Sequence, residues 1–139
     1  MSDALNASLS ISGAGMAAQS KRLRVITENV ANANTTASTP EADPYRRKVV
    51  SFASVLDLKT GLSTVAVDRI GRDHSQFPTD HDPSNPAAGP DGMVKLPNVD
   101  LLVELADMRE ATRSYEANLQ TFKQAREMVT MTIDLLRSR

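Results

Sequence analysis

The chain has 139 residues, of which 40% are hydrophobic and only 4% aromatic, and it contains no cysteine. Its 16 basic and 17 acidic residues leave a net charge of −1. The basic excess of a nucleic-acid-binding protein is therefore missing, and neither a disulfide framework nor a thiolate metal site can form.

Two further patterns are missing from the sequence. Residues 1–9 lack the basic and apolar segments of a secretory signal. No apolar run reaches the roughly 18 residues of a membrane span. We therefore expect no direct membrane insertion, and export, if it occurs, by a route without a cleaved signal.

A helix is predicted from about Leu5 to Ala33. Its apolar residues alternate steps of three and four, which is typical of a coiled-coil seam, and Ser12 and Gln19 interrupt the pattern. The seam consists of Leu5, Leu9, Met16, Leu23, Ile26, Val30 and Ala33.

The segment Ser10–Gly15 is the weak part of this helix, because each of its two glycines costs about 1 kcal/mol relative to alanine. It indicates either a break or a late-folding start of the helix, or the close approach of a second helix, and we favour the first interpretation. The basic runs Lys21–Arg24 and Arg46–Lys48 are expected to be solvated or to contact other subunits.

The middle of the chain has strand and loop character. Strands are predicted at Tyr45–Phe52, Ser63–Ile70 and Met93–Leu96, since these segments contain β-branched residues in partial alternation. Prolines and glycines are dense in Asp73–Gly92, which predicts a surface loop without regular structure.

A second long helix is predicted from Asn98 to Arg137, with Asn98 as its N-cap and Asp100 in the first turn. Its seam consists of Leu105, Met108, Thr112, Tyr115, Leu119, Phe122, Val129, Ile133 and Leu136. Other apolar residues of the two helices lie off both seams: Val25, Leu102, Val103, Met128, Met131 and Leu135. A second apolar stripe predicts more than one helical neighbour.

These elements predict a mainly α fold, in which two terminal helices pack as a coiled-coil-like pair around a small β-rich insert. The expected division is 1–36, 37–97 with the proline-rich loop 73–92, and 98–139. Either a self-contained coiled-coil hairpin, acting as a soluble adaptor, or a polymerising subunit would satisfy this pattern.

Metal binding is a weaker alternative. Asp73-His74 and Asp80-His81-Asp82 carry ligands suited to a hard or borderline divalent metal. The sequence shows no nucleophilic triad and no phosphate-binding glycine loop, so we predict no enzyme, no cofactor and no metal.

Two segments resemble the signatures of the flagellar basal-body rod family. Near the N-terminus, Ser12–Gln19 is followed by Glu28–Thr35, which contains an N-[IV]-A-N-x-x-T run. Near the C-terminus, Pro97–Asp100 is followed by Arg113–Asn118, an R-x-Y-x-A-N core. The chain is also similar to the short proximal-rod members at Tyr45–Lys48, Asp82–Pro86 and Gly92–Val94.

The resemblance implies a structural subunit of the flagellar basal body, in the rod that spans the periplasm. It implies packing of both termini into the inner tube of the rod and unfolded export by the flagellar type III apparatus. The implied partners are further copies of the chain, other rod proteins, the membrane-ring base and the export apparatus. The expected subunit-interface residues are Leu23, Ile26, Asn29, Val30, Asn32, Met108, Tyr115, Asn118, Leu119, Phe122, Val129 and Ile133. Among them, Asn29, Asn32 and Asn118 are expected to be buried polar residues that disfavour wrong helix registers.

Overall fold

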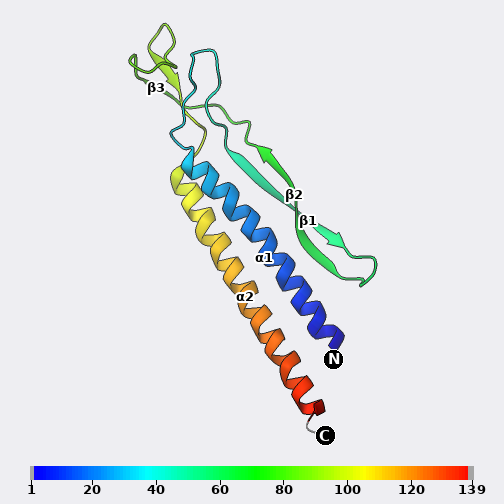
Figure 1. Ribbon diagram of the computed structural model, residues 1–139. Helices are drawn as coiled ribbons and strands as arrows, with labels where there is room; N and C mark the ends of the chain where they lie inside the picture. The colour runs from blue at the N-terminus through cyan, green and yellow to red at the C-terminus, as the bar shows by residue number, and fades with distance from the viewer. Residues whose placement is uncertain (1, 138–139) are drawn as a thin grey trace. The chain divides into compact units, whose positions relative to one another are not determined.

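The computed structural model describes residues 2–137. These residues form two long helices, with four strands between them (Figure 1). The elements are α1 (Ser2–Ala31), β1 (Lys48–Leu56), β2 (Ser63–Arg72), β3 (Thr79–His81), β4 (Met93–Lys95) and α2 (Leu101–Arg137). The predicted fold class is confirmed. Neither helix is long and apolar enough for a membrane span within the described residues.

The chain divides into two compact units. Unit 1 comprises the chain up to Leu23, Ser51–Arg69 and the chain from Arg109 onward, and unit 2 comprises Arg24–Val50 and Ile70–Met108. Each helix, and each strand of the β1–β2 hairpin, therefore contributes residues to both units. The division at residues 36 and 97 stays a prediction.

In unit 1, α1 and α2 pack closely in opposite directions. Arg22 Nη2 donates to Glu110 Oε2 at 3.1 Å, and Gly15 lies against Asn118. Gly15 comes before Arg22 in α1, whereas Asn118 comes after Glu110 in α2, so the two helices are antiparallel. A Cβ at Gly15 would lie 2.8 Å from the amide atoms of Asn118. The buried residues here are Ser12, Gly15, Ala18, Ala111 and Ala125, so the interior of this helix pair is made of small side chains.

The predicted break at Ser10–Gly15 is wrong, because α1 continues through this segment. The alternative of a close helix approach fits Gly15, which has no room for a side chain. Tertiary packing outweighs the low helix propensity of the two glycines, as is general for helices in proteins.

The β1–β2 hairpin closes through the turn Asp57–Leu62. Asp57 N donates to Leu62 O at 2.8 Å, and Gly61 N donates to Asp57 O at 2.7 Å. Gly61 has a φ of 68°, which a residue with a Cβ adopts at a cost. The strand predicted at Tyr45–Phe52 begins later, at Lys48, and extends to Leu56.

In unit 2, β3 and β4 form a second antiparallel pair, with Asp80 opposite Val94. Val94 is buried, as is Ala87 in the loop between these strands. The prediction of no regular structure in Asp73–Gly92 is wrong at β3. Its prolines flank the three-residue strand rather than occupy it, so the N–H groups needed for pairing remain available.

The start of α2 also differs from the prediction. Asp100 Oδ1 accepts hydrogen bonds from the backbone N–H groups of Leu102 (2.8 Å) and Val103 (3.3 Å), so Asp100 is the N-cap. The prediction of Asn98 as the cap is wrong, because its amide bonds the strand and loop segments described below.

Candidate assembly surface and its polar network

A buried polar network lies in unit 2. Glu104 on α2 is 0% exposed and Asn29 on α1 is 1% exposed. Glu104 Oε1 accepts from Arg47 Nε at 2.5 Å, and Oε2 accepts from Asn29 Nδ2 at 3.1 Å. Both oxygens of this buried carboxylate are therefore partnered, as burial of a charge requires.

Asn29 binds the backbone at the start of β1 as a neighbouring strand would. Its Nδ2 donates to Lys48 O at 2.9 Å, and its Oδ1 accepts from Lys48 N at 2.9 Å. The same Oδ1 accepts from the Tyr45 hydroxyl at 2.9 Å. This side chain supplies the paired bonds of an antiparallel ladder, and it thereby connects α1, β1 and α2.

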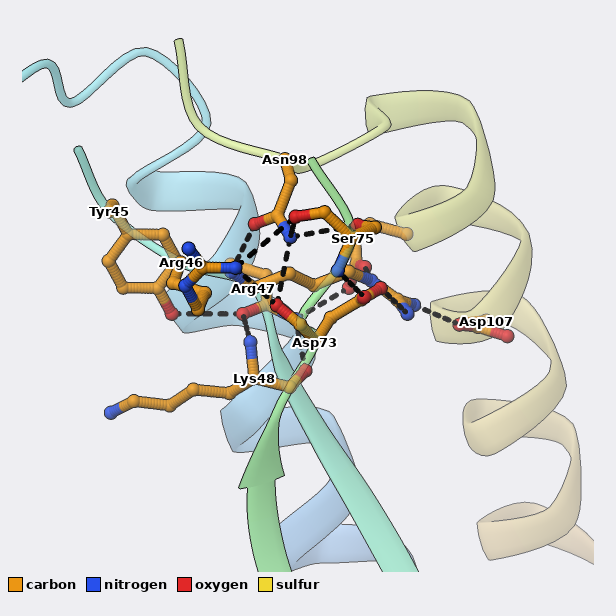
Figure 2. A network of polar contacts seen from close by, with 10 residues as sticks. Tyr45, Arg46, Arg47, Lys48, Asp73, Ser75, Asn98 and Asp107 are labelled. Atoms are coloured by element: carbon orange, nitrogen blue, oxygen red, sulfur yellow. Dashed lines mark hydrogen bonds and ion pairs between the residues drawn. The ribbon is translucent and has the colours of Figure 1, made fainter. Parts of the chain in front are cut away.

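Arg47 joins the strand to α2 and to the segment after β2 (Figure 2). Its Nη2 lies 3.3 Å from Asp107 Oδ2, and its Nη1 lies 3.7 Å from Asp73 Oδ2. Its backbone N–H donates to Asn98 Oδ1 at 2.8 Å. Asn98 in turn donates from Nδ2 to Asp73 O and to Ser75 Oγ, both at 3.0 Å.

The neighbours of Arg47 are also engaged within the chain. The Arg46 guanidinium lies 4.0 Å from the centroid of the Phe77 ring, in cation–π geometry, and Lys48 pairs with Glu28. The prediction that Arg46–Lys48 is simply solvated is therefore wrong, and its contact with other subunits stays a prediction. Five acidic groups pair with this basic run and attract it to its own chain: Glu28, Asp43, Asp73, Glu104 and Asp107.

The surroundings shift the pKa values of three groups in this unit. Burial, together with the charges of Glu28 and Glu104, raises the pKa of Tyr45. Partial burial opposes the charge of Arg47, but the hydrogen bond and charge of Glu104 outweigh it and raise the pKa of Arg47. Hydrogen bonds from Ser75 lower the pKa of Asp73.

The predicted interface residues occupy three environments. Ile26 and Asn29 are buried, and Ile133 is exposed. The others are half-buried: Leu23, Val30, Asn32, Met108, Tyr115, Asn118, Leu119, Phe122 and Val129. Their role between subunits stays a prediction.

The three asparagines expected to be buried behave differently. Asn29 is bonded to other elements of the fold. Asn32 Nδ2 donates to Glu28 O at 2.8 Å, and Asn118 Nδ2 donates to Ser114 O at 2.9 Å. The latter two amides are half-buried and bond the preceding turn of their own helix.

Large apolar side chains are exposed along α2, and Ile11 is exposed on α1. In unit 1, Met128, Met131 and Leu135 have the i, i+3, i+7 spacing of one helix face, and Leu135 is 70% exposed. We call these three residues the outer stripe. In unit 2, Leu101, Leu102, Val103 and Leu105 are exposed while Glu104 points inward. Of the residues predicted to lie off the seams, Val25 alone is buried.

Sequence reasoning missed Glu104. It assigned Leu105 to the seam, but Leu105 is exposed, and the inward positions on α2 include Glu104, Ala111 and Ala125. These positions share a seven-residue frame, in which Asn118 also falls. A search for a heptad of small and polar residues would have found this face.

The residues of the metal-binding alternative do not form a metal site in the described part of the chain. Within residues 2–137, no group of three or more His, Cys, Asp or Glu side chains could hold a metal ion. Asp82 is bonded instead by Ser84, whose hydroxyl donates at 2.6 Å.

Comparison with known proteins finds similarity along almost the whole chain. The family model "Flagella basal body rod protein" matches residues 9–37, and "Flagellar basal body rod FlgEFG protein C-terminal" matches residues 91–135. Flagellar basal-body rod protein FlgC of Agrobacterium fabrum is 54% identical over 98% of both chains. The FlgC proteins of Salmonella typhimurium and Bacillus subtilis are 39% and 36% identical, over 90% and 92% of this chain and 92% and 95% of theirs.

Proposed function

Because the chain belongs to the family of flagellar basal-body rod proteins named FlgC, we propose that it polymerises into the rod through the outward faces of its terminal helices. The resemblance predicted from the two signatures is confirmed. The protein is a structural rod subunit of the flagellar basal body.

One observation carries this proposal: in unit 1 the small side chains lie inside and the large apolar ones outside. The interior holds Ala18, Ala111 and Ala125, whereas the outer stripe is exposed. Burying a Leu or Met side chain stabilises an interface by about 1.5–3 kcal/mol. The apolar area of the outer stripe would therefore be buried only on contact with a neighbour.

The proposed neighbours are further copies of the chain, other rod proteins and the membrane-ring base. Two of the three residues of the outer stripe are methionines, whose flexible side chains suit contacts with non-identical partners. The predicted interface residues on the half-buried margins of the helix pair, such as Leu119 and Phe122, would complete these contacts. Residues 1–36 and 98–139 would form the rod-building part and 37–97 the insert.

We also propose export by the flagellar type III apparatus in an unfolded state. The proposal rests on family membership. The weak interior of unit 1 is consistent with it, because a helix pair held by small side chains is easily opened.

The test is a pair of double variants in a strain that carries no other copy of the gene. Met131→Glu/Leu135→Glu puts two charges on the outer stripe. Gln120→Glu/Gln124→Glu, on the same side of α2, adds the same charge without removing apolar area. We expect the first variant to be absent from purified basal bodies and its strain to be non-motile. The control variant is expected to assemble.

Export and assembly are separated by assaying the culture medium. The stripe variant is expected there as secreted, unassembled protein. Normal rods in the Met131→Glu/Leu135→Glu strain would contradict the assembly surface. A variant retained in the cytoplasm would contradict the expectation that substitutions in the outer stripe leave export intact. The variant Leu119→Asp probes the predicted seam in the same assay and is also expected to be lost from the rod.

A further inference from the structure

The small side chains inside the helix pair discriminate poorly between registers. On α2, Ala111 and Ala125 lie in one seven-residue frame with Asn118 between them, and both alanines are buried, as is Ala18 on α1. A slip by seven residues displaces α2 by about 10 Å and exchanges positions within this frame, so that Asn118 or Glu104 takes the place of Ala111 and an alanine takes the place of Asn118 beside Gly15. The alanines themselves have little shape to distinguish the two arrangements.

The polar network has the opposite property, because its groups fit only one register. Asn29 uses both amide hydrogens, toward Glu104 and Lys48 O, and its oxygen accepts two further bonds. A slip of seven residues in one direction replaces Glu104 by Ala111. Asn29 and Arg47 would then lose the carboxylate, and unpaired buried polar groups are strongly disfavoured.

We infer that Asn29, Arg47 and Glu104 set the register of α1 against α2, and with it the position at which β1 leaves the helix pair. The small residues allow the two helices to approach closely, and the network selects the register in which they do so. A single buried polar residue selects the register of coiled coils in the same way. This inference concerns the folded subunit and does not depend on the proposed assembly surface.

The absence of cysteine from the chain permits a cross-linking test. Arg22→Cys with Glu110→Cys reports the native register, because these side chains are in contact. Arg22→Cys with Ala117→Cys, or with Val103→Cys, reports a slip of seven residues in either direction. Each pair is treated with a short bismaleimide in the otherwise unchanged protein and in two network variants.

The first variant, Asn29→Leu/Arg47→Met/Glu104→Leu, replaces the network by apolar side chains. The second, Asn29→Leu, leaves the Arg47–Glu104 pair in place. In the unchanged protein we expect the native cross-link to exceed either slipped one at least about tenfold. In the triple variant the ratio is expected to approach one, and in Asn29→Leu to fall about threefold.

Two outcomes overturn the inference. In the first, the triple variant keeps its helical circular dichroism and gives the same ratio of native to slipped cross-links as the unchanged protein. The second applies to the single variant. If the triple variant does not fold, the single variant Asn29→Leu decides. A ratio of native to slipped cross-links in Asn29→Leu that equals the ratio in the unchanged protein would overturn the inference.

Discussion

The two units hold themselves together by different means. Unit 2 buries Val25, Ile26 and Val94 and pairs its buried Asn29 and Glu104. Unit 1 buries small residues, and the Oε1 atom of Gln19 is buried there without a hydrogen-bond partner in the described part of the chain. Unit 2 therefore has an interior of large apolar side chains and paired polar groups, as in a self-contained domain. Unit 1 has an interior of small side chains instead.

The difference shows which apolar side chains the chain buries within itself and which it leaves exposed. A monomer that buried its large apolar side chains internally would have little left for its neighbours. Here the outer stripe and the hairpin residue Leu58, which is 89% exposed, keep that surface available.

The largest expected effect tests the interior of unit 2. Glu104→Ala removes the carboxylate that pairs with Arg47 and Asn29 and should destabilise the protein by about 3–5 kcal/mol. Urea unfolding followed by circular dichroism measures this. The matched control, Glu110→Ala, removes an exposed partner of Arg22 and should cost about 0–1 kcal/mol. Equal losses of unfolding free energy in Glu104→Ala and Glu110→Ala would contradict the larger contribution assigned to the buried ion pair.

A smaller effect tests the close packing of unit 1 by comparing alanine substitutions at two glycines of α1. Gly15→Ala places a methyl group 2.8 Å from Asn118 and should destabilise by about 1–2 kcal/mol, because overpacking outweighs the gain in helix propensity. Gly13→Ala meets nothing within 4 Å and should stabilise by about 0.5–1 kcal/mol. Melting temperatures that rise in both variants would show that α1 and α2 are not in close contact at Gly15.

The smallest effect concerns Tyr45. Tyr45→Phe removes the hydrogen bond to Asn29 Oδ1 and should cost about 1 kcal/mol at neutral pH. The pKa of Tyr45 is raised above its ordinary value of 10.0, so its contribution is complete below that pH and is lost as the pH rises through the folded pKa. Unfolding free energies measured from pH 8 to 11 should therefore fall less steeply for Tyr45→Phe. Parallel curves for the two proteins would show that this hydroxyl does not titrate with folding.

Local pattern predicted the elements better than it predicted their contacts. The three-four spacing located both helices, and β-branched runs located three of the four strands, because these signals depend on residues close in sequence. The break at Ser10–Gly15 and the cap at Asn98 were wrong. Gly15 lies against Asn118, and Asn98 is hydrogen-bonded to Arg47 and Ser75. These partners lie far away in the chain.

The sequence by itself determined the family, the two long helices and the absence of thiol chemistry, since signatures and periodicity are local properties. Only the tertiary structure decided which helix face points inward. Leucines surround Glu104, and residue hydrophobicity alone would turn the leucines toward the partner helix. Arg47 and Asn29 reverse that choice, because a carboxylate with both oxygens paired can be buried while the leucines beside it remain for contacts outside the subunit.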